Sequence, residues 1–343
     1  MIRQLYRYIL SLGLLLLILN YAYGQEPEYM AWSVSTVRPL AMGTAFTSIV
    51  DDIAAALYNP AAFSLYQNQK TFRATLFMNP VMTFSAYRYY SNDFRENITG
   101  SRIARGASLG IKALFISTYN FEAGLILNEH SLAHTFHDND IFMLEPNRSW
   151  ADGANTFVAS LKIAKRAVIG VSGSYYIIPE ETQFNHRLGF SYGILLKPHD
   201  RLNVGLSYID LPKAAPEFRY LYERLADETM NIGISYYPSS STILSLDIRN
   251  LTEESLENIR EAHVGVEQYI FSIAALRAGI YRERLSGRFF YSTGIGLLDS
   301  NLFFNPENKF EHRQFTMNYA FIYKDEGSEK YSQSHFISLL IRF

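Results

Sequence analysis

The chain has 343 residues, with 31 Lys and Arg against 33 Asp and Glu and a formal net charge of −2. This balance is too weakly basic for a nucleic-acid-binding protein and too weakly acidic for a disordered acidic tail. Cysteine is absent, whereas 25 Tyr and 24 Phe make the chain aromatic-rich with only 2 Trp. A mean hydropathy of −0.05 is what strands with alternating apolar and polar faces produce, although a soluble β-sandwich shares that average.

The amino-terminus has the pattern of a secretory signal peptide over residues 1–24. Arg3 and Arg7 precede an apolar run over 9–19, and the small residues Ala22 and Gly24 lie just before Gln25. That run is too short for a membrane-spanning helix, which favours cleavage over an uncleaved anchor. Without Arg3 and Arg7, 29 basic and 33 acidic residues remain, a net charge of −4. Export without any cysteine suits a fold that needs no disulfides.

Residues 25–69 lack the alternation of a strand and predict a compact segment of short helices. Small residues predominate over 38–63, and Asp51 and Asp52 precede a short apolar run that suits the start of a helix. Asn59 and Pro60 then end it, because the residue before proline avoids the helical region. Such a segment ahead of a barrel predicts a hatch inside the lumen.

From residue 70 to 343 the sequence consists of period-2 segments separated by turn signals, which predicts an all-β domain. Over 202–208, Leu202, Val204, Leu206 and Tyr208 alternate with small or polar residues. The same pattern recurs at 109–115, 121–127, 157–163, 169–175, 188–196, 230–236, 244–248, 264–270, 276–280 and 315–323. This many strands favours a closed antiparallel transmembrane β-barrel, and an even number, about 14, is expected.

Connections of alternating length agree with a barrel that has tight turns at one end and longer loops at the other. The tight turns are expected at 164–167, 197–201 and 238–242, and the longer loops at 129–153, 211–228, 251–261, 299–314 and 324–333.

The residues opposite the apolar rows are expected to face the lumen. Charged side chains fall on that face at Arg73, Lys112, Glu122, Lys162, Asp247, Arg249, Glu267 and Arg277. An interior ion-pair network that pins the hatch and a polar conduit both remain open as interpretations. Glycines recur on the same face, at Gly110, Gly124, Gly170, Gly189, Gly193, Gly205, Gly233, Gly265 and Gly279. They allow close approach of another backbone or merely fit a narrow lumen.

The last ten residues, 334–343, form one more strand, apolar on one face and mixed on the other. Ten extended residues are long enough to cross a hydrocarbon layer when tilted. A terminal strand that ends on an aromatic residue, here Phe343, resembles the last strand of bacterial outer-membrane barrels. That resemblance implies an assembly signal at Phe343, the barrel-assembly machinery as a partner, and an outer-membrane location in contact with lipid.

A more specific resemblance lies in the amino-terminal segment. Arg38-Pro-Leu-Ala-Met-Gly-Thr-Ala-Phe46, the pair Asp51 and Asp52, and Tyr58-Asn-Pro-Ala61 resemble the hatch of the outer-membrane long-chain fatty-acid transporter (FadL-like) superfamily. That superfamily typically has Met-Gly-Gly-Ala-Phe and Asn-Pro-Ala-Gly, so Thr44 and Ala62 depart from it. The resemblance implies a hatch motif at Met42, Gly43, Asp51, Asp52, Asn59, Pro60 and Ala61.

Later segments, at 264–268, 276–280 and 294–297 together with the terminal strand, look like the branch that contains PorV and PorQ. The proteins of that branch are outer-membrane components of the type IX secretion system, and the branch points to a Bacteroidota-like origin. Two functions therefore follow from resemblance. One is a plugged channel that passes hydrophobic small molecules across the outer membrane. The other is a shuttle or scaffold that binds the signal domains of exported proteins.

Enzymatic function is not expected, because no Ser–His–acid arrangement is suggested by the spacing of these residues. No cofactor is expected. His130, His134 and His137, with Asp138 and Asp140, form a cluster whose residue types bind transition metals. Their spacing matches no established site, and surface loops often carry such residues, so no metal site is predicted.

Overall fold

The computed structural model describes residues 29–31, 36–50, 52–62, 72–80, 110–130, 153–179, 184–210, 228–251, 260–270, 274–282, 287–298, 315–327 and 330–343. The region predicted as a signal peptide lies outside them, as does Asp51. Among the described residues, no helix has the length and apolar character that spanning a membrane would require.

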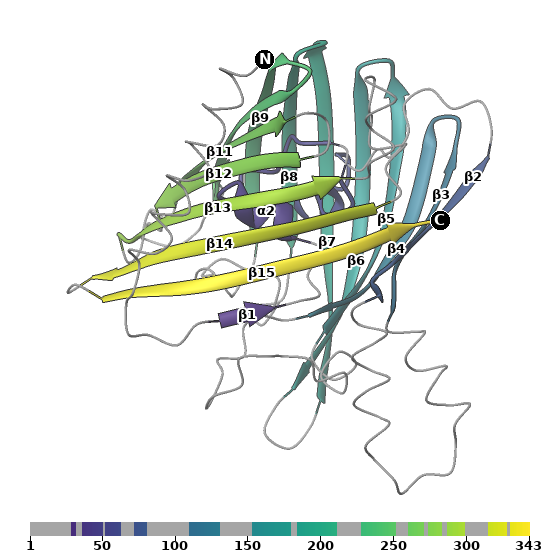
Figure 1. Cartoon of the computed structure of the whole chain (residues 1–343). Helices are drawn as coiled ribbons and strands as arrows, with labels where there is room; N and C mark the ends of the chain where they lie inside the picture. Colours follow the sequence, from purple (N-terminus) through teal and green to yellow (C-terminus); the bar gives the residue numbers. More distant parts are fainter. Residues whose placement is uncertain are drawn as a thin grey trace, which may run out of the picture.

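The described strands form one sheet, antiparallel except for one short strand, that closes on itself around two short helices (Figure 1). The helices are α2 (Val37–Ala41) and α3 (Ala55–Tyr58). The strands are β1 (Tyr29–Ala31), β2 (Arg73–Met78), β3 (Ile111–Thr118), β4 (Phe121–His130), β5 (Gly153–Ala164), β6 (Ala167–Pro179), β7 (Phe184–His199), β8 (Leu202–Asp210), β9 (Glu228–Ser239), β10 (Thr242–Arg249), β11 (Glu261–Ile270), β12 (Ala274–Arg282), β13 (Phe289–Leu298), β14 (Phe315–Gly327) and β15 (Lys330–Arg342).

Strands β2 to β15 follow one another in sequence order around the barrel, and each pairs antiparallel with its neighbours. Closure comes from β15 and β2, through the pairs Ile341↔Met78 and Arg342↔Phe77. Beyond them, Phe343 N donates to Leu76 O at 2.9 Å, and Leu76 N donates to Phe343 O at 3.1 Å. These fourteen strands confirm the predicted all-β closed antiparallel barrel.

A fifteenth strand, β1, was not foreseen in the sequence. It pairs in parallel with β15, from Tyr29↔Ser334 to Ala31↔Phe336. Three residues are too few for period-2 alternation to be recognised, so β1 carries no sequence signal.

Alternation within the strands matches the predicted faces. In β8 the inner residues Asn203, Gly205 and Ser207 are buried, while the apolar residues between them are partly exposed. In β15 the inner residues are Phe336, Ser338 and Leu340. Figure 1 shows β12–β15 crossing the direction of β5–β7, as tilted strands on opposite walls of a barrel do.

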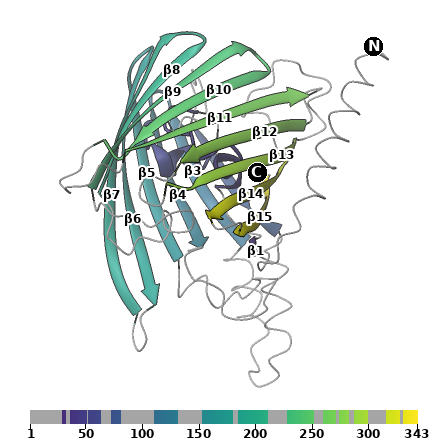
Figure 2. The ribbon, with the colours of Figure 1, turned by 90° about the vertical axis from the view of Figure 1, so that its left-hand side faces the viewer.

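One of the predicted connections is wrong. Residues 324–333 are not a loop, because β14 extends to Gly327 and β15 begins at Lys330, with Lys324 paired to Ser332. The ladder there continues through polar residues, so the apolar alternation ends before the backbone pairing does. The predicted loop at 299–314 falls between β13 and β14, outside the described residues. Figure 2 shows β6 and β7 extending well past their neighbours at the end of the barrel away from the tight turns.

Candidate functional site

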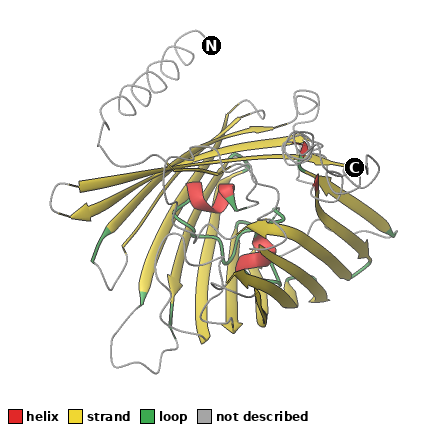
Figure 3. Cartoon of the chain, turned by 90° about the horizontal axis from the view of Figure 1, so that it is seen from below, coloured by secondary structure: helices red, strands yellow, loops and turns green. Residues whose placement is uncertain are grey.

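The interior of the barrel is occupied by the chain itself. We call residues 36–50 and 52–62 the inner segment. Seen along the barrel in Figure 3, its two helices lie inside the curve of the strands. Nearly every residue of this segment is buried, including the whole of α2. Small residues allow that packing, and the predicted break at Asn59 is present, since Asn59 has an extended backbone (φ −156°) before Pro60.

Arg38 is the first anchor of the inner segment in the wall. Its guanidinium donates to both carboxylate oxygens of Glu267 on β11, from Nε to Oε2 at 2.9 Å and from Nη2 to Oε1 at 2.6 Å. Nη2 also donates to Tyr269 Oη at 3.2 Å, and Nη1 donates to Asp52 Oδ2 at 3.3 Å. Arg38 is 2% exposed and Glu267 is fully buried. A two-pronged bond of this kind fixes orientation as well as distance.

The same carboxylate is shared with a second arginine. Arg277 on β12 donates from Nε to Glu267 Oε2 at 2.5 Å and from Nη1 to Asn318 Oδ1 at 2.9 Å. Asn318 on β14 in turn donates to Ser338 Oγ on β15 at 3.3 Å. The network therefore runs from the inner segment across β11, β12, β14 and β15.

Asp247 on β10 is the second anchor. Its Oδ2 accepts from the backbone N–H of Phe46 at 2.8 Å and of Thr47 at 2.9 Å, and from Thr47 Oγ1 at 2.7 Å. Arg249, two residues along the strand, donates to Thr44 O and lies 3.7 Å from Asp247. A buried carboxylate with three donors holds the backbone over 44–47 against β10.

Sequence reasoning did not assign His263 and Asn59 their contacts. His263 Nδ1 lies 2.9 Å from both Thr44 Oγ1 and Gly43 O, and its ring stacks on Tyr281 at 4.5 Å. Asn59 Nδ2 donates to Thr47 O at 2.9 Å and to Ile194 O on β7 at 3.2 Å. The alternation on β11 places His263 on the same face as Glu267, which was the available signal.

Glycines of the inner face lie where the backbone of the inner segment touches the wall. A Cβ added at Gly279 would lie 2.0 Å from Gly43 N, and one at Gly205 would lie 2.2 Å from Thr47 O. The same holds for Gly170 against the backbone of Pro60 and Gly265 against that of Met42, whereas Gly193 and Gly294 face the side chains of Asn59 and Ala41. Close approach of another backbone, one of the two interpretations of these glycines, therefore describes Gly170, Gly205, Gly265 and Gly279.

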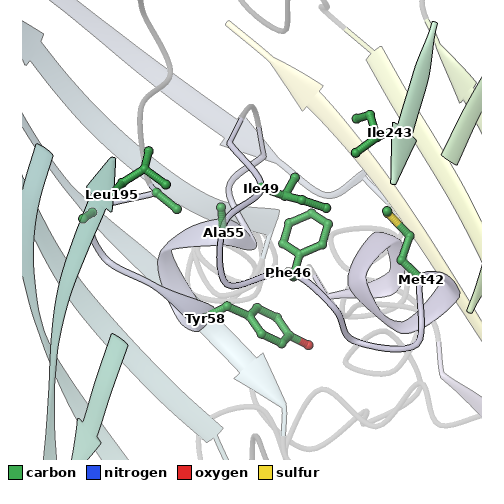
Figure 4. Close-up of a cluster of buried hydrophobic side chains, with 9 residues drawn as sticks. Met42, Phe46, Ile49, Ala55, Tyr58, Leu195 and Ile243 are labelled. Carbon is green, nitrogen blue, oxygen red and sulfur yellow. The ribbon is translucent and has the colours of Figure 1, made fainter. Parts of the chain in front are cut away.

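Apolar side chains of the inner segment also pack against the barrel wall in three clusters. In Figure 4, Phe46, Ile49 and Tyr58 of the inner segment lie between Leu195 of β7 and Ile243 of β10. A second cluster joins the inner segment to the opposite wall and comprises Ile53, Ala56, Phe77, Ala113, Phe115, Ile126, Val158 and Leu340. A third packs Val37, Leu40 and Ala41 against β12–β15.

The predicted lumen-facing charges divide into two groups. Asp247, Arg249, Glu267 and Arg277 gather around the inner segment. The other four lie elsewhere in the sheet. Lys112 and Glu122 are buried in the wall of β3 and β4, Lys162 is half-buried beside a turn, and Arg73 is exposed at the start of β2.

The predicted hatch residues that the structure describes are all in the inner segment. Met42, Gly43, Asn59 and Ala61 are buried, Pro60 lies against Gly170, and Asp52 contacts Arg38. Phe343 is 68% exposed, and its backbone takes part in closure. Its role as an assembly signal stays a prediction. The described residues hold no group of three metal-ligating side chains, and His134, His137, Asp138 and Asp140 lie outside them.

No protein-family model matches the sequence, and the comparison with curated proteins gave no match. Among solved structures, a triple mutant of Rhodopseudomonas blastica porin is 9% identical, with a TM-score of 0.37 over 68% of this chain and 78% of that chain. A structure described as "Asymmetric conductivity of engineered proteins" gives the same values. Because these TM-scores are below 0.5, the barrel assignment rests on the strand pairing of this chain.

Proposed function

We propose that the chain is an outer-membrane β-barrel whose lumen is closed by the inner segment, and that it serves as a plugged channel for hydrophobic small molecules. The outer face supports the membrane location. Large apolar side chains on β3–β13 are exposed there, including Phe157 at 48%, Tyr192 at 50% and Val264 at 46%. Within the described strands, outer rows carry charges only near strand ends, as at Asp210 and Arg282. A Lys or Arg near mid-bilayer would cost about 2–4 kcal/mol.

The proposal that the inner segment closes the lumen is supported by its contacts with opposite walls of the barrel. Asp247 and Glu267 hold it on one side, and the cluster around Ile53 and Phe115 packs it on the other. A segment held against both walls lies across the lumen, so in this proposal passage requires the inner segment to move.

The substrate class comes from the resemblance of the inner segment to the hatch of fatty-acid transporters. A hydrophobic molecule of that kind would be captured at the longer loops and released past the inner segment. Binding of such a molecule requires a mostly apolar pocket with a few polar groups that fix its orientation.

Deletion of residues 36–62 tests the plug directly. The protein, refolded into planar lipid bilayers, is expected to conduct ions steadily after the deletion and very little before it. If the deletion variant fails to fold, the double variant Asp247→Asn with Glu267→Gln keeps the chain length and weakens both anchors. A folded variant of either kind with unchanged conductance would refute the plug. Uptake of a labelled long-chain fatty acid tests the substrate, and a deletion strain with normal uptake would count against it.

The alternative is a type IX secretion component, a PorV- or PorQ-like scaffold that binds signal domains of exported proteins. One observation favours it. The network from Arg38 through Glu267 and Arg277 ties the inner segment to several strands at once, which suits a segment that stays in place. Co-purification separates the two functions, because a scaffold brings secretion partners or cargo, whereas a transporter comes alone or with lipid.

A further inference from the structure

Two neighbouring tight turns concentrate positive charge at one end of the barrel. The turn between β5 and β6 carries Lys165 and Arg166, the turn between β7 and β8 carries Arg201, and Lys197 lies near the end of β7. We call these four residues the basic patch. Asp200 is the only carboxylate within these two turns. Lys165, Arg166 and Arg201 are exposed, and Lys197 is half-buried.

The patch is held together across the two turns. Arg166 Nη1 donates to Pro198 O at 2.7 Å, and Lys197 N donates to Arg166 O at 2.9 Å. The guanidinium also lies 3.5 Å from Asp200 Oδ1, a carboxylate that is 79% exposed. The arginine of one turn is therefore fixed beside the basic residues of the next.

The other described tight turns carry no such charge. The turn between β3 and β4 is Tyr119 and Asn120, and the turn between β9 and β10 is Ser240 and Ser241. The chain after the predicted signal has a net charge of −4. The positive charge is thus a local feature of two turns, not a property of the whole surface.

The patch adjoins the apolar outer face. Ile163, two residues before Lys165, is 58% exposed, and Leu196, near the end of the outer row of β7, is 44% exposed. Long basic side chains that follow exposed apolar residues reach the level at which the hydrocarbon layer meets the headgroups.

We propose that the basic patch binds the phosphates of anionic phospholipids in the membrane leaflet that faces the tight turns. The inference rests on the proposed insertion of the barrel into a membrane. Clusters of Lys and Arg beside a membrane-spanning element attract anionic headgroups, and this attraction weakens with salt. Continuity with the apolar outer face favours a lipid over an acidic soluble protein.

The absence of native cysteine allows a clean test. A fluorophore is attached through Ser240→Cys, on the adjacent uncharged turn, and the full-length protein is reconstituted into phosphatidylcholine vesicles. Quenching by spin-labelled phosphatidylglycerol is compared with quenching by spin-labelled phosphatidylcholine. We expect quenching by the anionic lipid to be at least about threefold stronger at low salt, and the preference to disappear at high salt.

The main variant replaces all four patch residues with Gln and should bring the quenching ratio to about one. The matched control neutralises two basic residues at the opposite end, Arg260→Gln with Arg282→Gln, and should leave the ratio unchanged. Lys165→Arg with Lys197→Arg keeps the charge and should keep the preference.

The outcomes separate the inference from the proposed function. Flotation with vesicles reports insertion, and a protein that does not float would refute the membrane location itself. A protein that floats and shows no lipid preference would overturn the basic patch alone. Loss of the preference in the opposite-end control would equally overturn it, because general charge would then explain the quenching.

Discussion

The two halves of the inner segment are held in different ways. Residues 36–50 add directional contacts to their apolar packing, with Arg38 on Glu267 and the backbone of Phe46 and Thr47 on Asp247. Residues 52–62 pack Ile53 and Ala56 into an apolar cluster with β2–β5. Asn59 of this half donates to Ile194 O on β7.

The two kinds of contact have different effects on the position of the inner segment. Hydrogen bonds and ion pairs require a defined geometry, so the first half has one place in the barrel. Apolar contacts depend on buried area and volume, so the second half tolerates small displacements at moderate cost. We therefore expect polar substitutions to release the inner segment and apolar substitutions to weaken the protein without releasing it.

The largest effect is expected for Glu267→Gln. The substitution leaves Arg38 and Arg277 buried without their shared carboxylate, and breaking a buried pair costs about 3–5 kcal/mol. Urea unfolding of protein folded into vesicles measures this loss of stability, and ion conductance should rise as the first half detaches. The control Asp210→Asn, at the partly exposed end of β8, should change stability by less than about 0.5 kcal/mol. A stable, non-conducting Glu267→Gln variant would show that polar contacts do not fix the position of the first half.

Next in size is Ile53→Ala, which tests the apolar half. Ile53 is 1% exposed, and truncation of such a side chain costs about 2–5 kcal/mol through lost burial and the cavity left behind. Conductance should stay at the level of the unmodified protein, because Arg38 and Asp247 still hold the first half. Ile163→Ala on the outer face leaves no interior cavity and should cost less. Strong conductance in Ile53→Ala would mean that apolar packing also determines position.

Gly279→Ala probes the closest approach of the two backbones. The added Cβ would lie 2.0 Å from Gly43 N and 2.2 Å from Met42 C, and backbone atoms of this kind cannot move aside independently. Overpacking costs about 1–3 kcal/mol, and the first half should shift enough to raise conductance. The matched control is Gly173→Ala, whose Cβ would meet only the Phe190 ring at 3.7 Å. Equal behaviour of the two alanine variants would show that the wall adapts.

The sequence predicted the barrel better than it predicted the site. Period-2 alternation places each residue of a long strand on one face, so the burial of Asp247 and Glu267 follows from the pattern around them. It does not give the neighbours of a residue across the lumen. Arg38 lies 229 positions from Glu267, and no local pattern connects them.

The errors have physical causes as well. β14 and β15 extend into a polar stretch near Lys324, where backbone pairing persists without apolar alternation. His263 and Asn59 were not assigned to the anchors, because a single polar residue on a strand or in a turn has many possible partners. The resemblance to a known hatch marked the residues 42–46 as important, and it also marked Thr44 as the position that departs from the usual glycine.

Thr44 offers the smallest and most local prediction. Its φ is 60°, in the left-handed region that costs a residue with a Cβ about 1–2 kcal/mol. Its Oγ1 donates to Gly43 O at 2.7 Å and contacts His263 Nδ1, which offsets part of that cost. Thr44→Gly and Thr44→Ala both lose the hydroxyl, but only glycine relieves the backbone. Thr44→Gly should therefore be more stable than Thr44→Ala by about 1 kcal/mol in urea unfolding. If alanine is tolerated as well as glycine, the turn at Thr44 can relax, and the first half is held less rigidly than its polar contacts indicate.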